Sequence, residues 1–339
     1  VAKCRCNAVN KPVMTDALQQ PIAALGEDLS ARVLGQPELI ERLLIAVLAD
    51  GHLLLEGPPG VAKTRAAFLL ANAFDVSFQR IQFTPDLLPS DLTGTSIYDP
   101  SQHEFSFHPG PVFHDFILAD EINRAPAKVQ AALLEAMAER QVTVAGQTRA
   151  LSKSFFVIGT QNPIEEEGTY ELPVAQLDRF LMRVHVAYPD SQAERDILDM
   201  VQAEKQHGAG HTPPVQGMRS IAAGQLQEAR KSVLNVQLSD PIKDYIVRLV
   251  QATREPVRDG PPHAAPVANP VSPRGTLALA HLSQARAWLR GRDYVLPEDV
   301  QDLAFDVLAH RLSLTYQAKA QGLTERGFLD DMLSRVPTV

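Results

Sequence analysis

The stretch that decides the fold is GPPGVAKT at residues 57–64. It matches the phosphate-binding pattern G-x-x-x-x-G-K-[ST] at every position except Ala62, where the pattern has its last glycine. The run HLLL at residues 52–55 predicts a buried strand before the loop, and residues 65–74 predict a helix after it. This order is what a phosphate-binding loop requires, because backbone N–H groups and a helix N-terminus must converge on the phosphate.

The side chains of this loop have separate expected tasks. Lys63 is expected to reach the β and γ phosphate oxygens, and Thr64 is expected to face Mg²⁺. A methyl group at Ala62 requires right-handed helical φ/ψ, and under that condition the loop can still close. A glycine-rich turn before a helix is the alternative interpretation. The expected nucleotide-binding residues of the loop are Gly57, Pro58, Pro59, Gly60, Val61, Ala62, Lys63 and Thr64.

A second expected strand ends in two acids. Residues 116–119 (FILA) lead directly to Asp120 and Glu121. Asp120 can hold the water shell of Mg²⁺, and Glu121 can polarise the attacking water. Adjacent acids also occur at helix N-termini, where the helix dipole favours them. Downstream of a phosphate-binding loop, the pair indicates a nucleoside triphosphatase.

Four further motifs follow in order: ADEINRA at 119–125, QAALLEAM at 130–137, GTQNP at 159–163 and QLDRF at 176–180. Together with the Ala before Lys63, they resemble the MoxR family of AAA+ ATPases, from about residue 33 to the last helices. The resemblance implies an α/β P-loop AAA+ fold. It consists of a doubly wound parallel sheet with helices on both faces, followed by a small all-α lid domain.

The resemblance also implies roles that spacing alone does not assign. Asn162 is similar to sensor 1, which orients the attacking water, although Asn-Pro is also a turn signal. The strand of residues 155–160 that it ends is expected between the loop strand and the acidic strand. Gly35 and Gln36 belong to the turn that in this family approaches the adenine.

Two arginines are implied to act on the nucleotide. Arg179 is similar to the arginine finger, which neutralises charge on the γ-phosphate of a neighbouring subunit. A surface ion pair is the alternative interpretation of Arg179, and Arg183 or Arg124 could compete for the role. Arg274, in the sequence Ser-Pro-Arg, is similar to sensor 2.

The order of expected strands and helices predicts the domain organisation. Strands are expected at 53–55, 78–83, 116–120, 155–159 and 183–186, whereas residues after 189 show only helical spacing. We therefore expect an extension at 1–14, an AAA+ nucleotide-binding core at 15–189 and a helical lid domain at 190–339. A Pro-rich insertion near 258–273 departs from the family pattern just before Arg274.

Two segments predict β-hairpins by their alternation and turn residues, at 93–108 and 141–151. The first is expected to interrupt the helix after the second core strand, as an insert does in the family. Hairpins of this kind line the central pore or face the partner in related hexamers. Plain surface hairpins are the alternative.

Composition sets further limits. The net charge of −8 offers no general affinity for nucleic acid. No apolar run approaches the roughly 20 residues that cross a bilayer, and the start lacks the apolar centre of a secretory signal, so a cytoplasmic location is expected. Cys4 and Cys6 have no partner cysteines, and the histidines at 103, 108 and 114 lack metal-ligand spacing.

The expected function is Mg²⁺-dependent ATP hydrolysis by a homo-oligomeric ring, a hexamer, because an arginine finger needs a neighbour. The resemblance implies chaperone-like remodelling or maturation of a partner protein, one with a von Willebrand factor A (VWA) domain. A slow nucleotide switch that scaffolds a partner is the alternative, and a DNA-directed motor is a weaker one. Nothing in the sequence visibly excludes GTP.

Overall fold

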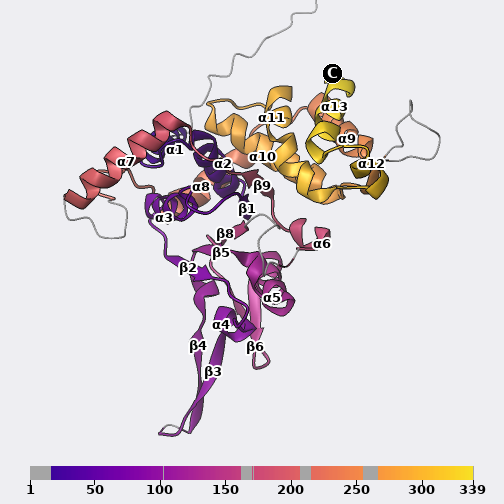
Figure 1. Cartoon of the computed structure of the whole chain (residues 1–339). Helices are drawn as coiled ribbons and strands as arrows, with labels where there is room; N and C mark the ends of the chain where they lie inside the picture. The colour runs from indigo at the N-terminus through magenta and orange to yellow at the C-terminus, as the bar shows by residue number, and fades with distance from the viewer. Residues whose placement is uncertain are drawn as a thin grey trace, which may run out of the picture.

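The computed structural model describes residues 17–101, 103–161, 170, 172–206, 215–254 and 266–338. Its centre is a parallel five-stranded sheet in the order β2–β5–β8–β1–β9 (Figure 1). The strands are β1 (Leu53–Glu56), β2 (Phe78–Gln82), β5 (Phe116–Asp120), β8 (Phe156–Gln161) and β9 (Met182–His185). The predicted parallel sheet is confirmed, and β8 lies between the loop strand β1 and the acidic strand β5.

Helices cover both faces of the sheet. Along β1, Leu53 and Leu55 join one hydrophobic cluster and Leu54 joins the other, because successive side chains of a strand point to opposite faces. The first cluster includes helices α1 (Gln19–Ser30), α2 (Pro37–Leu48) and α3 (Lys63–Ala73), and the second includes α4 (Pro89–Thr93) and α5 (Ala127–Glu139). This layering confirms the doubly wound arrangement and leaves the carboxyl edge of the strands open for a site.

The region after residue 189 is mainly helical. Its helices are α7 (Ser191–Gln206), α8 (Ala223–Leu234), α9 (Asp240–Ala252), α10 (Pro273–Leu289), α11 (Pro297–Leu308), the 3-10 turn η3 (Ala309–Arg311), α12 (Tyr316–Ala320) and α13 (Glu325–Arg335). The expectation of helices alone is wrong, since β10 (Val267–Asn269) pairs with β11 (Ser313–Leu314). Strands of three and two residues are too short to give a periodic signal.

Ion pairs of two buried arginines, Arg42 and Arg286, connect α2, α10 and α11. Arg42 of α2 is 3% exposed and contacts Asp306 at 2.7 Å and Asp302 at 3.0 Å. Arg286 of α10 also contacts Asp302, at 3.0 Å, and pairs with Asp299 at 2.6 Å. The larger hydrophobic cluster likewise extends from α1 to α13. The expected boundary at residue 189 stays a prediction. None of the described helices has both the length and the apolar character to span a membrane.

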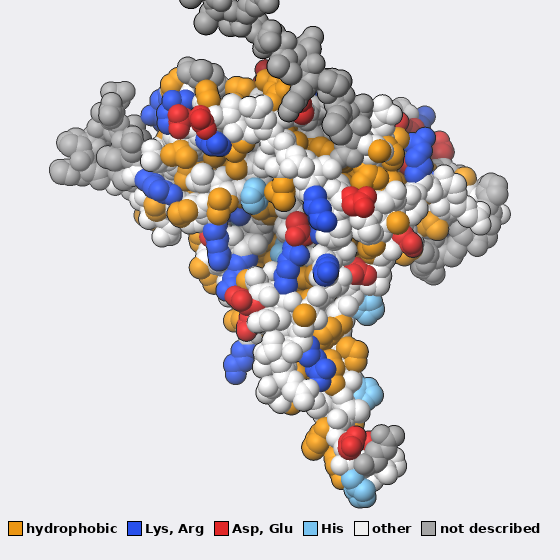
Figure 2. Space-filling view, turned by 180° about the vertical axis from the view of Figure 1, so that it is seen from behind, with side chains coloured by type: hydrophobic (Ala, Val, Ile, Leu, Met, Phe, Trp, Pro, Cys, Tyr) orange, Lys and Arg blue, Asp and Glu red, His pale blue; other side chains and the backbone are white. Residues whose placement is uncertain are grey.

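Both predicted hairpins are present. The longer one, β3 (Gly94–Asp99) with β4 (Glu104–Pro109), projects from the rest of the chain (Figure 1). It is flanked by the five-residue helix α4 and the 3-10 turn η1 (Pro111–Phe113), so it does interrupt the helical connection between β2 and β5. Figure 2 shows hydrophobic side chains along it and acidic and histidine side chains near its free end. The shorter hairpin is β6 (Gln141–Val144) with β7 (Gln147–Ala150).

Candidate nucleotide site

β1 leads into the phosphate loop at the carboxyl edge of the sheet. At Gly57, an added Cβ would lie 2.2 Å from the carbonyl oxygen of Val186, so only glycine fits. Gly60 has φ +84°, and the space beside its Cα is open. Lys63 is 7% exposed, and its Nζ donates a hydrogen bond to the Gly57 carbonyl oxygen at 2.7 Å. The lysine ammonium therefore lies over the loop at the start of α3, where Thr64 occupies the second helical position.

The backbone at Ala62 differs from the expectation. Its φ of 62° and ψ of 16° lie in the left-handed region, so the expectation of right-handed geometry is wrong. A Cβ in this region costs roughly 1–2 kcal/mol through its contact with the following carbonyl. The loop closes with that strain present, because buried neighbours such as Val61 and Lys63 fix the chain on either side.

Asp120 and Glu121 lie at the same edge of the sheet, one strand beyond β8. Thr160 of β8 connects them: its hydroxyl donates to Asp120 Oδ1 at 2.6 Å and accepts the Glu121 backbone N–H at 2.9 Å. Glu121 has φ 58°, and this turn directs the chain out of the strand into the 3-10 turn η2 (Ile122–Arg124). A fully buried threonine therefore contacts both acids, Asp120 through its carboxylate and Glu121 through its backbone N–H.

Strand β2 supplies partners that the sequence did not reveal. Arg80 contacts Asp120 Oδ2 at 2.6 Å, and Gln82 Nε2 donates to Glu121 Oε2 at 2.8 Å. Arg124 pairs with the same Glu121 carboxylate at 3.2 Å. The available signal was weak: residues 80 and 82 are polar positions two apart on a strand, so their side chains share a face.

A pocket of about 110 Å³ opens beside the phosphate loop. Gln36 lies in its wall and donates to the Ala187 carbonyl at 2.8 Å, while Gly35, with φ +74°, allows close packing on Pro189. The pocket is lined by Arg32, Val33, Leu34, Gln36, Gly60, Val61, Ala62, Arg65, Pro189, Ile197, Met200 and Val201. The wall from α7 was missed, although 197, 200 and 201 have the spacing of one helical face. An apolar pocket at this place fits a nucleotide base.

An ion pair fastens α7 to the helix that follows the loop. Arg65 of α3 contacts Glu204 through Nη1 at 3.1 Å and donates from Nε to the Arg32 carbonyl at 2.8 Å. The hydrogen bonds that Arg65 donates to Glu204 lower the pKa of the Glu204 carboxyl. The pocket wall is thereby connected to the same helix that carries Lys63 and Thr64.

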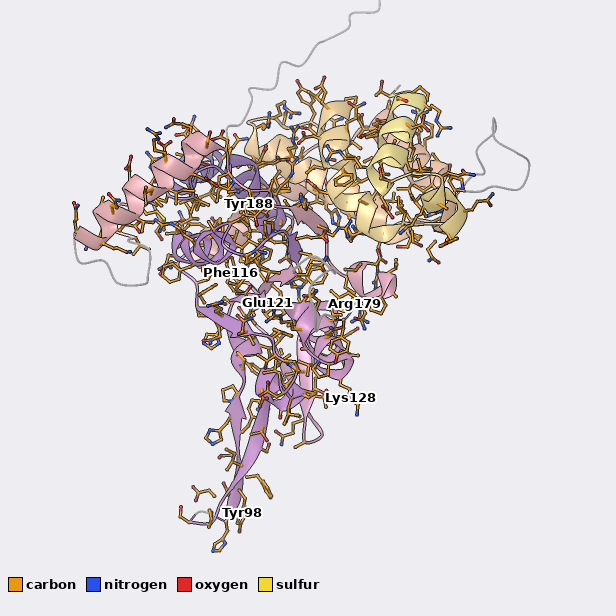
Figure 3. All side chains as sticks on the ribbon, in the orientation of Figure 1. Tyr98, Phe116, Glu121, Lys128, Arg179 and Tyr188 are labelled. Atoms are coloured by element: carbon orange, nitrogen blue, oxygen red, sulfur yellow. The ribbon has the colours of Figure 1, made fainter. Side chains whose placement is uncertain are left out.

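Arg179 and Arg274 line a second cavity, of about 320 Å³. Arg179 follows α6 (Val174–Leu177) and donates to the Leu134 carbonyl of α5 at 2.6 Å. In Figure 1, α6 lies on the opposite side of the core from α3 and α7, and Figure 3 shows Arg179 beside α6. None of the phosphate-loop residues lines this cavity. The structure thus brings the two arginines together, but apart from their own chain's loop.

The two competing arginines lie elsewhere. Arg183 contacts Glu56 at 3.6 Å at the end of β1, and Arg124 contacts Glu121, so both are paired within their own site. Asn162 lies outside the described residues, and the last described residue of its strand is Gln161. The extension at 1–14 and residues 258–265 of the Pro-rich insertion also lie outside them.

The donor set fits a triphosphate with Mg²⁺. The open space at Gly60 and the Lys63 ammonium suit phosphate oxygens, since helix N-termini and buried cations favour anions. The Thr64 hydroxyl and the Asp120 carboxylate are oxygen ligands, which Mg²⁺ prefers. Asp120 ends strand β5, and Thr64 begins the helix that follows β1 and the phosphate loop, so both groups belong to the carboxyl edge of the parallel sheet.

Comparison with known proteins agrees with this geometry. The sequence profile of the ATPase family associated with various cellular activities (AAA) matches residues 52–182, and that of the AAA lid domain matches residues 264–332. The chain is 45% identical over 305 residues to the chaperone MoxR1 of Mycobacterium tuberculosis, covering 90% of this chain and 78% of that protein.

Two further proteins are similar over nearly their whole length. The uncharacterized protein YeaC of Bacillus subtilis is 45% identical over 310 residues, covering 91% of this chain and 92% of that protein. A crystal structure of a candidate ATPase from Cytophaga hutchinsonii superposes with a TM-score of 0.83 at 40% identity, covering 94% and 95% of the two chains. On this fold, these motifs and these similarities, the chain belongs to the MoxR family of AAA+ ATPases.

Proposed function

We propose that this protein hydrolyses ATP with Mg²⁺ as an oligomeric ring, a hexamer, and uses the cycle to remodel or mature a partner protein. One observation carries the hydrolytic part of the proposal. The loop lysine, the acids at the end of β5 and the Thr160 hydroxyl that contacts both acids meet at one edge of the sheet. A base pocket opens beside the same loop.

Each residue has a distinct task in this proposal. Lys63 and the loop amides would bind the β and γ phosphates, while Thr64 and Asp120 would hold the metal ion. When bound, Mg²⁺ neutralises charge on the β and γ oxygens. Glu121 accepts a proton from the attacking water as the water oxygen bonds to the γ-phosphorus, and the bond to the bridging oxygen breaks with its electron pair leaving on ADP.

Thr160, Gln82 and Arg124 position the Glu121 carboxylate and backbone, as their hydrogen bonds and ion pair indicate. We assign the sensor 1 role, orientation of the attacking water, to Asn162, the next residue in the sequence after β8. Gly35 and Gln36 border the base, which we propose is adenine.

The position of Arg179 supports the proposed ring. Its separation from its own phosphate loop supports action on a neighbour's γ-phosphate, and the pairing of Arg124 and Arg183 within the site supports Arg179 over them. Because Arg274 lines the same cavity as Arg179, we propose that sensor 2 also acts across the interface. Such cationic groups in trans are commonly worth about 10³–10⁵ in rate.

The protein-directed role rests on the similarity to MoxR1, which is named a chaperone. We propose a partner with a VWA domain. If the protein is instead a slow switch that scaffolds a partner, addition of a VWA-domain protein would leave ATP turnover unchanged. If it is a DNA-directed motor, DNA would accelerate ATP turnover. The ATPase rate measured with each addition separates these functions.

Two variants test the hydrolytic site. Lys63→Ala should abolish binding of a fluorescent ATP analogue, because the cation aimed at the phosphates is lost. Glu121→Gln should bind the analogue at near wild-type affinity yet fail to release phosphate, because an amide cannot act as a base. Equal loss of binding in both variants would contradict the separate roles.

A further inference from the structure

A buried arginine lies behind the cavity of Arg179 and Arg274. Arg311, at the end of η3, is 3% exposed and directs its guanidinium at the segment that carries Arg179. Its Nε donates to Asp178 Oδ1 at 2.8 Å, its Nη2 to the Phe180 carbonyl at 2.6 Å and its Nη1 to the Leu181 carbonyl at 3.1 Å. The contacts fall on residues before and after Arg179, so both sides of that residue are fixed.

Asp178 extends the same set of contacts to Arg274. Its second oxygen, Oδ2, accepts the Ser272 hydroxyl at 3.0 Å and lies 3.8 Å from the Arg274 guanidinium. Ser272 also accepts the Arg274 backbone N–H at 3.2 Å, as the N-cap of α10. One carboxylate thus contacts both the buried arginine and the start of the helix that presents Arg274.

The charges favour a fixed arrangement. Burial lowers the pKa of Arg311 to about 10 and the Asp178 carboxylate opposes that shift, so Arg311 remains charged at neutral pH. The neighbouring His310 is buried with its pKa lowered well below the ordinary value, which keeps a second positive charge out of the cluster. A buried planar guanidinium with several oxygen acceptors has little freedom to reorient.

We propose that Asp178 and Arg311 form a positioning pair that holds Arg179 and Arg274 in the geometry needed to reach a neighbour's nucleotide. This inference rests on the trans-acting role proposed above for those two arginines. Arg179 is exposed and Arg274 is more than half exposed, so neither guanidinium is fixed by burial. Apart from the hydrogen bond from Arg179 to the Leu134 carbonyl, each depends on the backbone that carries it. A misplacement of about 1 Å in a catalytic group can lower the rate about 10²-fold.

The test compares Arg311→Met with a matched control in the same lid. Arg311→Met should lower kcat about 10²-fold while the KM for ATP stays within about threefold of wild type, because the variant's own loop and base pocket are intact. The control is Arg286→Met, which also removes a buried arginine from a buried aspartate, Asp299, but has no contact with residues 178–181. It should keep kcat near wild type even if it lowers the melting temperature similarly.

A second variant covers the case in which Arg311→Met fails to fold. Asp178→Asn keeps the volume and the acceptor for Ser272 but loses the charge beside Arg311, and the same selective fall in kcat is expected. Adding Arg311→Met or Asp178→Asn to the Arg179→Ala, Arg274→Ala background should lower the residual rate little further, because the pair acts through those arginines.

The results separate the two proposals. If Arg179→Ala itself keeps wild-type kcat, the proposed trans-acting function fails. Suppose instead that Arg179→Ala is inactive, whereas the Asp178→Asn and Arg311→Met variants fold, assemble and keep kcat within about threefold of wild type. The positioning pair is then wrong, and the proposed function stands. If Arg311→Met and the Arg286→Met control lowered kcat equally, the proposed positioning pair would also be wrong, since the fall would reflect a general loss of stability.

Discussion

At the scale of single residues, the phosphate loop departs from its pattern at one backbone position. Ala62 carries the left-handed geometry that a glycine would adopt without strain. Lys63, Asp120 and Glu121 could be predicted from the sequence because each follows a strand within a local motif. The partners Arg80 and Gln82 could not, since they lie about 40 residues from the acids and reach them only through pairing of β2 with β5.

Replacing Ala62 tests the strained loop. Ala62→Gly should raise the free energy of unfolding by up to about 1 kcal/mol, since relief of roughly 1–2 kcal/mol of strain exceeds the entropy that glycine loses. Ala62→Val should instead cost about 1 kcal/mol or more, because a β-branched residue is poorly accommodated at positive φ. Denaturant unfolding measures both. A stable Ala62→Val would contradict the left-handed geometry.

Thr160 offers a second test at this scale. Thr160→Val keeps the volume but removes the hydroxyl between Asp120 and the Glu121 N–H. It should cost about 1–3 kcal/mol of stability through unsatisfied polar groups, and lower kcat about tenfold or more through misplacement of Glu121. ATP affinity, measured separately with the fluorescent analogue, should change little. Loss of affinity with unchanged kcat would show that Thr160 serves binding instead.

At the scale of elements, both hairpins could be predicted because their alternation and turns are local. In the shorter one, Ala145 and Gly146 both have positive φ, as a two-residue hairpin turn requires. The hydrophobic periodicity of the sequence does not predict the order of the strands in the sheet. Only the family resemblance indicated that β8 lies between β1 and β5. The pair β10–β11 was missed because its strands are too short and join segments far apart in the chain.

A histidine directly before β1 should make stability depend on pH. His52 is buried where β1, β8 and α5 meet, with Nδ1 accepting the Val157 N–H at 3.0 Å and Nε2 beside the Met137 carbonyl at 3.2 Å. Burial lowers its pKa to about 4 from the ordinary 6.5. The neutral form is therefore preferred in the folded state, so its stabilising contribution is present above pH 6.5 and is lost as the pH falls toward 4.

Thermal or denaturant unfolding at about pH 7.5 and about pH 5.5 checks this prediction. At one pH unit below the unfolded-state pKa, protonation of the histidine favours the unfolded state by about 1.4 kcal/mol. The free energy of unfolding of wild type should therefore fall by about 1 kcal/mol more over this pH range than that of His52→Asn. His310, also buried with a lowered pKa, should leave part of the acid sensitivity in the variant. An equal pH response in both proteins would contradict a neutral, hydrogen-bonded His52.

At the scale of the whole molecule, the two proposed functional regions lie apart and share no lining residue. The phosphate loop and base pocket lie beside α3 and α7, whereas the cavity of Arg179 and Arg274 lies between the core and α10. The sequence predicted the residues of the phosphate loop and the two arginines. It did not predict that Arg274 shares a cavity with Arg179, because the segment before Arg274 departs from the family pattern. A chain with its pocket and its cationic cavity apart is expected to complete each site by assembly.

The most direct test of this account mixes Arg179→Ala with Lys63→Ala, each of which should be inactive alone. In mixed rings, Arg179→Ala subunits supply intact pockets and Lys63→Ala subunits supply intact arginines, so roughly one quarter of sites should be whole after random assembly. ATPase activity should therefore reappear on mixing. A mixture of Glu121→Gln with Lys63→Ala, in which no pocket is intact, should remain inactive. If mixed rings form and the first mixture also stays inactive, Arg179 does not act across the interface.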